Sequence, residues 1–340
     1  MGRNTTKGEP VSTRWRTAVA ALAVLGMVAA GCGDDDDGGD GAADEGAGDA
    51  AELTPITVGI LPIADLAPLY HGIEAGYFED EGLDVTTEVG QGGAALVPAV
   101  VSGEYQFAFG NYVSLMLARQ NGVEVQIVTN VVSGADTADR GTNALLVAPD
   151  SGIESVEDLA GRTFAVTTLE NVAEVNIRTT LREAGVDDAD ISFVELPFPD
   201  MNAAAQEGEV DVAWQAEPFV TLGEAAGLVN IVDPMYATTP SMPLAGMFAS
   251  QAWLEDNPEL AEAFHRAMQR SLEASDDEQA MRAAIEANTQ TPPDVVPDLA
   301  LANWQPDLDL DKLGLVGELA TEYGVLDEEP DLDQLVWDAG

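Results

Sequence analysis

Cysteine and histidine are almost absent from this chain of 340 residues, which contains only Cys32, His71 and His265. A single cysteine cannot form an intramolecular disulfide, and these three residues cannot supply the four ligands of a structural zinc site. No pair of nucleophile and general base stands out either. We therefore expect a protein with no metal, no cofactor and no catalytic residues.

Basic residues are scarce as well: 13 lysines and arginines stand against 61 acidic residues, which gives a formal charge of −48. Such a charge repels the phosphates of nucleic acids and the surface of anionic lipids, so nucleic acid is excluded as a partner. The apolar content of 46% excludes a wholly disordered acidic chain. A length of 340 residues predicts about two domains.

The acidic residues are spread along the whole chain, and Lys312 is the only lysine beyond the first ten residues. Surfaces of this kind stay soluble at high salt, where self-repulsion is screened, so an acidic surface of the halophilic type is one interpretation. An acidic binding surface for a cationic partner is the other. The even spread of the acids favours the first.

Long hydrophobic runs are absent apart from residues 18–30, which follow a segment with four basic residues. Thirteen residues are too few for a helix that crosses a bilayer of about 30 Å, so we expect a cleavable export signal. Ala29, Ala30 and Gly31 before Cys32 resemble a bacterial lipobox, whose cysteine becomes lipidated and N-terminal. The alternative is an ordinary secretory signal followed by an incidental cysteine.

The N-terminal part of the chain is therefore expected to be an address and an anchor. We expect a lipoprotein signal peptide at residues 1–31 and an extracytoplasmic protein attached to the cell membrane through Cys32. Residues 33–52 are all Gly, Ala, Asp or Glu, a composition with nothing to bury. Residues 32–52 are thus expected to form the lipidated end and a flexible acidic linker.

Strand and helix patterns alternate through the rest of the chain, which predicts parallel pairing with helices on both faces of each sheet. We expect one α/β lobe from residues 53–142 and 244–340, and a second from residues 143–243. The predicted strands are residues 56–60, 84–89, 106–109, 125–131, 145–148, 163–167, 191–196, 210–213, 229–232 and 244–250. The predicted helices are residues 68–75, 93–102, 112–120, 172–183, 201–207 and 219–226, with amphipathic helices after residue 257 packed on the first lobe.

An internal repeat supports the two lobes. Residues 102–108 and 207–213 share a helix end, a Gly-Glu turn and a short strand, and polar and aromatic residues follow each of them. This weak symmetry indicates that both lobes are built on one plan.

Six segments carry a resemblance to a known family: residues 61–68 (LPIADLAP), 72–78 (GIEAGYF), 81–85 (EGLDV), 152–162 (GIESVEDLAGR), 208–211 (GEVD) and 217–218 (EP). Together they resemble the solute-binding proteins of ABC importers, in the group for nitrate, sulfonates, taurine and thiamine-pyrimidine precursors (NMT1/THI5-like). The resemblance covers about residues 54–275. It implies a type II periplasmic-binding-protein fold, in which the chain crosses twice between two α/β lobes that close on a small ligand.

The ligand site is expected at strand-to-helix turns, because ligands of open α/β sheets bind beyond the carboxyl ends of strands, beside free helix N–H groups. The turns are residues 62–66, 90–94, 110–112, 167–171 and 214–217, and members of the family place ligand contacts there. The candidate ligand-binding residues are Asp65, Gly92, Gly93, Asn111, Tyr112, Thr167, Thr168, Glu170, Asn171, Trp214, Gln215 and Glu217. Asn111, Thr168 and Asn171 can also be read as helix caps, and Glu217 as an acid at a helix start.

None of the five turns contains lysine or arginine, whereas Asp65, Glu170 and Glu217 bring carboxylates to them. Carboxylates beside the aromatic walls expected from Tyr112 and Trp214 suit an amine or a nitrogen heterocycle, so we favour an aminopyrimidine-like ligand. Backbone amides at helix starts also hold anions, so a sulfonate, taurine or nitrate is the alternative.

The function expected from this resemblance is that of a monomeric binding subunit. It would clamp a small organic ligand and deliver it to a membrane permease, with transport energy from a separate ATPase subunit. Two alternatives stand beside it: a binding subunit that feeds a sensor, and an enzyme similar to the pyrimidine synthases of the same fold. Those synthases resemble one another in a cysteine-rich motif, and this chain has no cysteine after Cys32.

Overall fold

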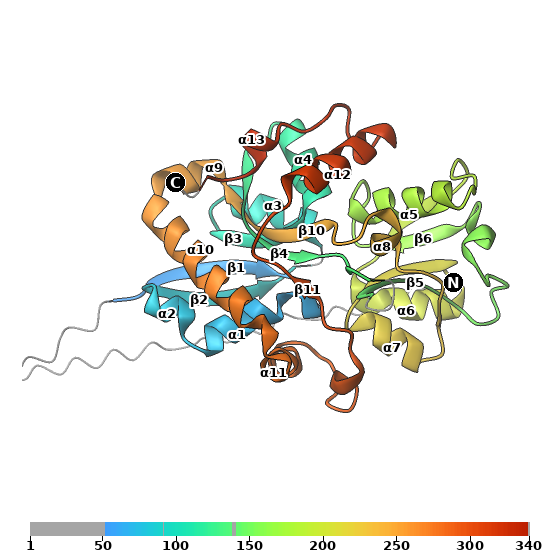
Figure 1. Ribbon diagram of the computed structural model, residues 1–340, viewed down its shortest axis with the longest axis horizontal. Helices are drawn as coiled ribbons and strands as arrows, with labels where there is room; N and C mark the ends of the chain where they lie inside the picture. The colour runs from blue at the N-terminus through green and yellow to red at the C-terminus, as the bar shows by residue number, and fades with distance from the viewer. Residues whose placement is uncertain (1–51, 91, 138–140, 339–340) are drawn as a thin grey trace, which may run out of the picture. The chain divides into compact units, whose positions relative to one another are not determined.

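The computed structural model describes residues 52–90, 92–137 and 141–338, and it contains two separate mixed β-sheets with helices on their faces (Figure 1). The predicted signal peptide, the lipidation site Cys32 and the linker up to residue 51 lie outside the described residues. Within them, no helix is both long and apolar enough to cross a membrane.

The first sheet has six strands in the order β11-β4-β10-β3-β1-β2. The strands are β1 (Thr54–Ile60), β2 (Leu83–Val89), β3 (Phe107–Asn111), β4 (Val125–Ser133), β10 (Pro243–Ser250) and β11 (Asn303–Trp304). All eight residues of β10 are buried, as expected for a strand with neighbours on both sides and helices above and below.

The second sheet has five strands in the order β7-β6-β8-β5-β9. The strands are β5 (Asn143–Val147), β6 (Thr163–Val166), β7 (Ser192–Glu195), β8 (Val212–Ala216) and β9 (Val229–Asn230). The chain passes from the first sheet to the second between β4 and β5, and it returns between β9 and β10.

The two sheets share one plan. The first sheet contains the order β2-β1-β3-β10-β4, and the second sheet has the order β7-β6-β8-β5-β9. In each order the fourth strand, β10 or β5, is the one that the chain enters directly after crossing from the other sheet. The predicted repeat falls on β3 and β8, which occupy equivalent positions in the two sheets. The internal symmetry seen in the sequence is therefore a symmetry of strand order.

Parallel pairing throughout, which the alternation predicted, is wrong for the strands next to the crossings. β1 pairs in parallel with β2 and β3, and β6 pairs in parallel with β7 and β8. In contrast, β10 runs antiparallel to β3 and β4, and β5 runs antiparallel to β8 and β9. A strand that enters from the other sheet takes its direction from that crossing, which the local order of strands and helices does not encode.

Helices cover both sheets. The helices before the first crossing are α1 (Ala67–Glu74), α2 (Tyr77–Asp80), α3 (Gly93–Val101) and α4 (Tyr112–Gln120), preceded by a 3-10 turn, η1 (Ala64–Leu66). Those that follow the crossing are α5 (Val172–Glu183), α6 (Phe198–Glu207), α7 (Phe219–Ala225) and α8 (Pro234–Thr238). The C-terminal part contains α9 (Gln251–Asp256), α10 (Pro258–Glu273), α11 (Glu278–Asn288), α12 (Leu310–Glu322) and α13 (Leu332–Leu335).

The C-terminal helices contact elements of both sheets. As predicted, α10 and α11 pack on α1 beside the first sheet, where Phe107 stacks on Phe264 at 3.7 Å between ring centroids. α12 departs from the prediction, because it packs against α4 and also against α5, which belongs to the second sheet (Figure 1). The C-terminal segment therefore bridges the two halves of the fold.

Candidate functional site

A narrow slot lies where strand ends of the two sheets meet. It has a volume of about 30 Å³, about the share of one water molecule in the liquid. The lining residues come from strand ends, turns and helix starts of both sheets: Leu61, Ile63, Asp65, Phe109, Asn111, Leu244 and Ala245 from the first, and Asn143, Thr167, Asn171, Val172, Phe198, Trp214 and Ala216 from the second. Four of the five predicted strand-to-helix turns contribute residues to this slot: residues 62–66, 110–112, 167–171 and 214–217.

Asp65 brings a buried carboxyl group to the slot. It lies in η1, directly after the turn that follows β1, and only 3% of its surface is exposed. Burial, with a further contribution from the nearby charge of Glu217, raises the pKa of Asp65 to about 7. No hydrogen bond to this carboxyl group forms within the described part of the chain. The group is therefore available to accept a hydrogen bond from a ligand.

Trp214 forms an aromatic wall of the slot and carries an unused donor. Its ring lies 5.9 Å from that of Phe198, with 26° between the planes. Its indole Nε1 is buried and has no hydrogen-bond partner among the described residues. A buried N–H group without a partner costs free energy, so its place in the lining of a slot points to a ligand atom that accepts this hydrogen.

Asn171 organises the turn between β6 and α5. Its Oδ1 accepts hydrogen bonds from the N–H groups of Ala173 and Glu174 and so caps α5. Its Nδ2 donates to the hydroxyl oxygens of Thr167 and Thr168, at 3.3 and 3.1 Å. The cap and the site are therefore one structure, and the two interpretations of Asn171 do not compete.

Asn111 has the equivalent position in the first sheet. It ends β3 and caps α4, because its Oδ1 accepts a hydrogen bond from the N–H group of Ser114 at 2.9 Å. Its Nδ2 donates to the Ser114 hydroxyl, and the residue also lines the slot. Asn111 is thus both a cap and a wall of the slot.

The predicted residues Tyr112 and Gln215 lie apart from the slot, because both are fully buried and neither lines it. The Tyr112 hydroxyl donates to Oδ1 of Asn130 at 2.6 Å, within the core of the first sheet. Gln215 donates to Oδ1 of Asn202 and to the carbonyl oxygen of Phe198. Each residue is next to a lining residue in the chain. In β8 the side chain of Gln215 lies on the face opposite that of Trp214. Tyr112 is the first residue of α4, and its side chain turns into the core of the first sheet.

Glu217 also lies outside the lining of the slot, and its hydrogen bonds link α7 to the segment at Ala300. Its carboxylate accepts hydrogen bonds from the N–H and hydroxyl groups of Thr221 and from the N–H group of Ala300. Its carbonyl oxygen accepts a hydrogen bond from Ala64 at 2.9 Å. Burial raises the pKa of Glu217 against the lowering effect of these bonds, and its charge acts on the slot through Asp65.

Glu170 is exposed and lines neither the slot nor the groove described next. Its backbone has a φ of +52°, in the left-handed region that is uncommon for residues other than glycine. This conformation turns the chain between β6 and α5, so the contribution of Glu170 is to the shape of the turn.

A second hollow, which we call the outer groove, borders the slot. It has a volume of about 190 Å³ and is lined by Gly92 and Ala95 at the start of α3, and by Thr167, Thr168, Glu195, Leu196 and Pro197 of the second sheet. The predicted residues Gly92 and Thr168 thus lie in the outer groove, while Thr167 lines both hollows. Gly93 is the first residue of α3.

Sequence reasoning missed Phe198 and Asn143. Phe198 begins α6 after the end of β7, so it belongs to a sixth strand-to-helix turn that the same rule would have identified. Asn143 begins β5 directly after a crossing between the sheets, and its Nδ2 donates to the carbonyl oxygen of Gln215 at 3.4 Å. A strand start of this kind has no local signature.

The lining of both hollows is uncharged or acidic. No lysine, arginine or histidine stands among the described residues that line them. No group of three potential metal ligands occurs anywhere in the described ranges. Asp65 can therefore accept a hydrogen bond from a ligand, and Trp214 can donate one and stack on the ligand. None of the described lining residues offers a cationic side chain.

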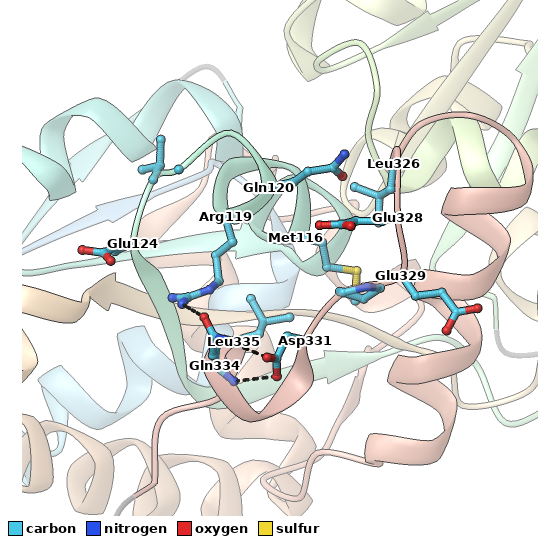
Figure 2. A pocket seen from close by; sticks show the side chains of 13 residues that line it. Met116, Arg119, Gln120, Glu124, Leu326, Glu328, Glu329, Asp331, Gln334 and Leu335 are labelled. Carbon is cyan, nitrogen blue, oxygen red and sulfur yellow. Dashed lines mark hydrogen bonds between the residues drawn. The ribbon is translucent and has the colours of Figure 1, made fainter.

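A larger hollow of about 370 Å³ lies at the C-terminal end of α4, where Figure 2 shows Arg119 beside Gln334. It shares none of its described lining residues with the slot. Arg119 is directed to its own neighbours there: it donates to the carbonyl oxygen of Val125 and to Oε1 of Gln334. Gln334 in turn donates to Asp331 at 2.7 Å. Arg119 is the one basic side chain in its described lining, and it is already bonded, so this hollow is a weaker candidate than the slot.

Comparison with known proteins identifies the relatives of this chain. The family model "NMT1/THI5 like" matches residues 63–279. The riboflavin-binding protein RibY of Chloroflexus aurantiacus is 26% identical over 272 residues, which cover 78% of this chain and 70% of RibY. The formylaminopyrimidine-binding protein of Halalkalibacterium halodurans is 23% identical over 228 residues, which cover 66% of this chain and 67% of that protein.

Solved structures show the same fold. The alkanesulfonate-binding protein SsuA from Xanthomonas axonopodis pv. citri, bound to MOPS, superimposes with a TM-score of 0.70 at 17% identity. The match covers 84% of this chain and 99% of SsuA. The two sheets with a slot between their strand ends are therefore the two α/β lobes of a periplasmic-binding-protein fold.

Proposed function

Because this chain belongs to the NMT1/THI5-like family, we propose that it is the solute-binding subunit of an ABC importer. One observation carries the proposal: strand ends of both sheets converge on one slot, and the slot holds a buried indole N–H group and a buried carboxyl group without partners among the described residues. Most buried polar groups in folded proteins are hydrogen-bonded, so two unpaired groups in one slot support a ligand there. The relatives named for binding riboflavin and formylaminopyrimidine support the same function.

The mechanism is a clamp. One lobe comprises residues 53–142 and 244–340, and the other comprises residues 143–243, so that the two crossings serve as the hinge. A slot of about 30 Å³ is too small for a heterocyclic ring, so the lobes part to admit a ligand and close on it. No bond is made or broken, and the ligand acts through its higher affinity for the closed form.

The ligand class that suits the slot is a flat nitrogen heterocycle with both a donor and an acceptor. Its face stacks on Trp214 beside Phe198, an acceptor atom meets Nε1 of Trp214, and a donor meets Asp65. A sulfonate or nitrate suits the slot less well, because the described lining contains a carboxyl group and no cationic side chain. We infer a binding role without catalysis.

The setting of the protein follows from the same proposal. The chain is exported, becomes attached to the outer face of the cell membrane through a lipid on Cys32, and acts as a monomer. Its partners are a permease and an ATPase subunit of the importer.

A thermal-shift panel tests the binding function. The purified chain is heated in molar salt with aminopyrimidines, flavins, polyamines, taurine, alkanesulfonates and nitrate. A ligand at 100 times its Kd stabilises the folded chain by about 2.7 kcal/mol, and we expect a shift with aminopyrimidines or flavins. A shift with sulfonate or nitrate alone would refute the ligand class and keep the importer function. No shift with any compound would count against the function itself.

A labelling experiment tests the anchor. Cells that express the chain are fed radiolabelled palmitate, and the Cys32→Ser variant is the matched control. We expect label in the native chain and none in the variant, which should appear in the medium or the soluble fraction. An unlabelled native chain with the same distribution as the variant would indicate an ordinary secretory signal.

A further inference from the structure

We propose that residues 300–312, which we call the strap, hold the two lobes in the closed form. This inference rests on the proposed clamp and concerns what keeps it closed before a ligand arrives. The strap runs from the segment after α11, through β11, to the first turn of α12 (Figure 1). Its hydrogen bonds reach the second lobe and both chain crossings, so one short segment joins parts that move relative to one another.

The middle of the strap is fixed to the first sheet. β11 pairs antiparallel with β4, and the N–H group of Gln305 donates to the carbonyl oxygen of Val131 just beyond this pairing. Nδ2 of Asn130, a buried residue of β4, donates to the carbonyl oxygens of Gln305 and Asp307. The strap therefore moves with the first lobe, and its contacts outside that lobe are the ones that resist opening.

One hydrogen bond of the strap crosses to the second lobe. The N–H group of Ala300 donates to Oε1 of Glu217 at 3.1 Å, and Glu217 also accepts from Thr221 within its own lobe. Next to this bond, the N–H group of Ala64 in the first lobe donates to the carbonyl oxygen of Glu217 at 2.9 Å. Parting of the lobes breaks the bonds from Ala300 and Ala64 and leaves those from Thr221. Since hydrogen bonds to a charged group are the stronger ones, the bond from Ala300 favours the closed form.

The strap also holds the hinge. The two chain crossings pair with each other through two backbone hydrogen bonds, of 2.8 and 2.9 Å. Nδ2 of Asn303 donates to the carbonyl oxygen of Gly134 in the first crossing, at 2.9 Å. Nζ of Lys312 donates to the carbonyl oxygen of Pro240 in the second crossing, at 3.0 Å. Each crossing is therefore tied to the strap, which restricts the backbone rotations that a hinge needs in order to open.

Trp304 connects the strap to the slot. Its Nε1 donates to the carbonyl oxygen of Asp65 at 2.8 Å, so β11 holds the turn that carries this buried carboxyl group. The same strap thus holds one buried acid of each lobe, Asp65 through Trp304 and Glu217 through Ala300. Neither Ala300 nor Trp304 is among the described residues that line the slot. They are positioning residues, which act on a ligand through the lobes.

Ala300→Pro tests the bond that crosses between the lobes, because proline has no N–H group. Leu299 before it has a φ of −58° and a ψ of 137°, which suit a residue that precedes proline. Ala189→Pro is the matched control. It removes an N–H group that donates to the Asp187 carboxylate at 3.0 Å, within the second lobe alone.

Spin labels report the closed form without any ligand. The background is the full chain with Cys32→Ser, which removes the only cysteine. Labels are attached at Val101→Cys on α3 and Asp200→Cys on α6, two exposed positions, one in each lobe. Parting of the lobes changes the distance between the labels, and pulsed electron paramagnetic resonance gives the population at each distance.

We expect the native strap to give a population at the distance found in the structure. Ala300→Pro should lower the ratio of closed to open chains about tenfold, which corresponds to about 1.4 kcal/mol, and Ala189→Pro should leave it unchanged. Lys312→Met, at a side chain that is 35% exposed, should lower the ratio as well. Equal ratios for Ala300→Pro and the native chain would overturn the proposal, and so would a native chain without the closed distance.

The amine of Lys312 gives a second measurement, of whether the two ends of the strap act together. Lys312 is the only lysine beyond the first ten residues, so acetylation of its peptide is followed directly by mass spectrometry. We expect Ala300→Pro to raise the acetylation rate of Lys312 several-fold, because a strap released at one end frees the amine at the other. Ala189→Pro should leave the rate as it is. The same rate in all three chains would show that the segment is not a strap.

Neither measurement uses a ligand, so their outcomes are separate from those of the thermal-shift panel. A strap that fails both measurements in a chain that binds a compound of the panel would leave the binding subunit standing. A strap that passes them in a chain that binds no compound would count against the proposed function and not against the strap.

Discussion

At the scale of single residues, Trp214 shows a cost to stability that binding can recover. Its buried Nε1 has no partner within the described ranges, and the free chain bears that cost. Trp214→Phe removes the donor and keeps an aromatic wall. We expect the melting temperature to stay level or rise, and heterocycle affinity to fall about tenfold. Calorimetric titration and a thermal melt measure the two effects.

Tyr112→Phe is the matched control. It also removes one polar hydrogen from a buried ring, but that hydrogen is bonded to Asn130 at 2.6 Å and lies outside the slot. We expect the reverse pattern, with a loss of about 1 kcal/mol in the free energy of unfolding and unchanged affinity. If both variants lost affinity equally, the assignment of Trp214 to the ligand would be wrong.

Asp65 makes stability depend on pH. Its pKa is about 7 in the folded chain against 3.8 for the ordinary group, so the folded chain holds a proton that the unfolded chain has lost. The contribution of Asp65 to the free energy of unfolding is fully present below pH 4 and is lost as the pH rises through 7. The difference between a pKa of 3.8 and one of about 7 corresponds to about 4 kcal/mol in the free energy of unfolding.

The Asp65→Asn variant measures this contribution. We expect its free energy of unfolding, relative to the native chain, to increase between pH 4 and pH 8, because the amide does not ionise. Denaturant titrations at several pH values give the difference. Asp84→Asn, at an exposed position of β2, is the control and should show no such trend. A flat difference for Asp65→Asn would contradict the ionisation of a buried carboxyl group.

At the scale of elements, the predicted bounds of α4 and α5 match the structure at both ends. Asn111 and Asn171 are N-caps with side-chain hydrogen bonds, and apolar residues follow each at helical spacing. These signals are local, which is why the sequence alone was enough. β10 is predicted within one residue at its start, but its antiparallel direction depends on a crossing from the other sheet, which no local pattern records.

The same contrast applies to the site. The rule about strand ends identified Asp65, Asn111, Asn171 and Trp214, which the structure brings to one slot. It could not separate Tyr112 from these residues, because the difference is the direction of a side chain at the first turn of a helix. Packing of distant segments decides that direction, so the sequence predicted which turns line the slot but not which residues of each turn do.

α12 links the two lobes away from the slot. Tyr323 at its C-cap accepts a hydrogen bond from Thr179 at 3.0 Å, and the guanidinium of Arg182 lies 4.3 Å from the centre of its ring. Both partners belong to α5. We expect Tyr323→Ala to favour the open form and to raise the ligand dissociation rate several-fold, as measured by stopped-flow fluorescence.

Tyr77 provides a matched control for this contact. The guanidinium of Arg270 lies 4.0 Å from the centre of its ring, and both residues belong to helices beside the first sheet. Tyr77→Ala removes a similar contact within one lobe and should leave the dissociation rate unchanged. Equal effects of the two variants would show that α12 does not act on closure.

At the scale of the whole molecule, we expect the acidic charge to make stability depend on salt. With a formal charge of −48, acidic groups repel one another across the surface, and salt screens that repulsion. We expect the melting temperature to rise by at least several degrees when potassium chloride is raised from about 0.1 M to about 2 M. Potassium chloride and sucrose series at matched osmolality separate screening from solute exclusion. A melting temperature that falls with salt would refute an adaptation to saline conditions.

The position of β10 has a consequence for the order in which the molecule folds. β10 separates β3 from β4, so the first sheet lacks a central strand until residues 243–250 are available. All strands of the second sheet lie within residues 143–230. During synthesis the second sheet can therefore form first, while the edges of β3 and β4 that pair with β10 remain unpaired. The half of the protein that begins the chain is the half that is completed last.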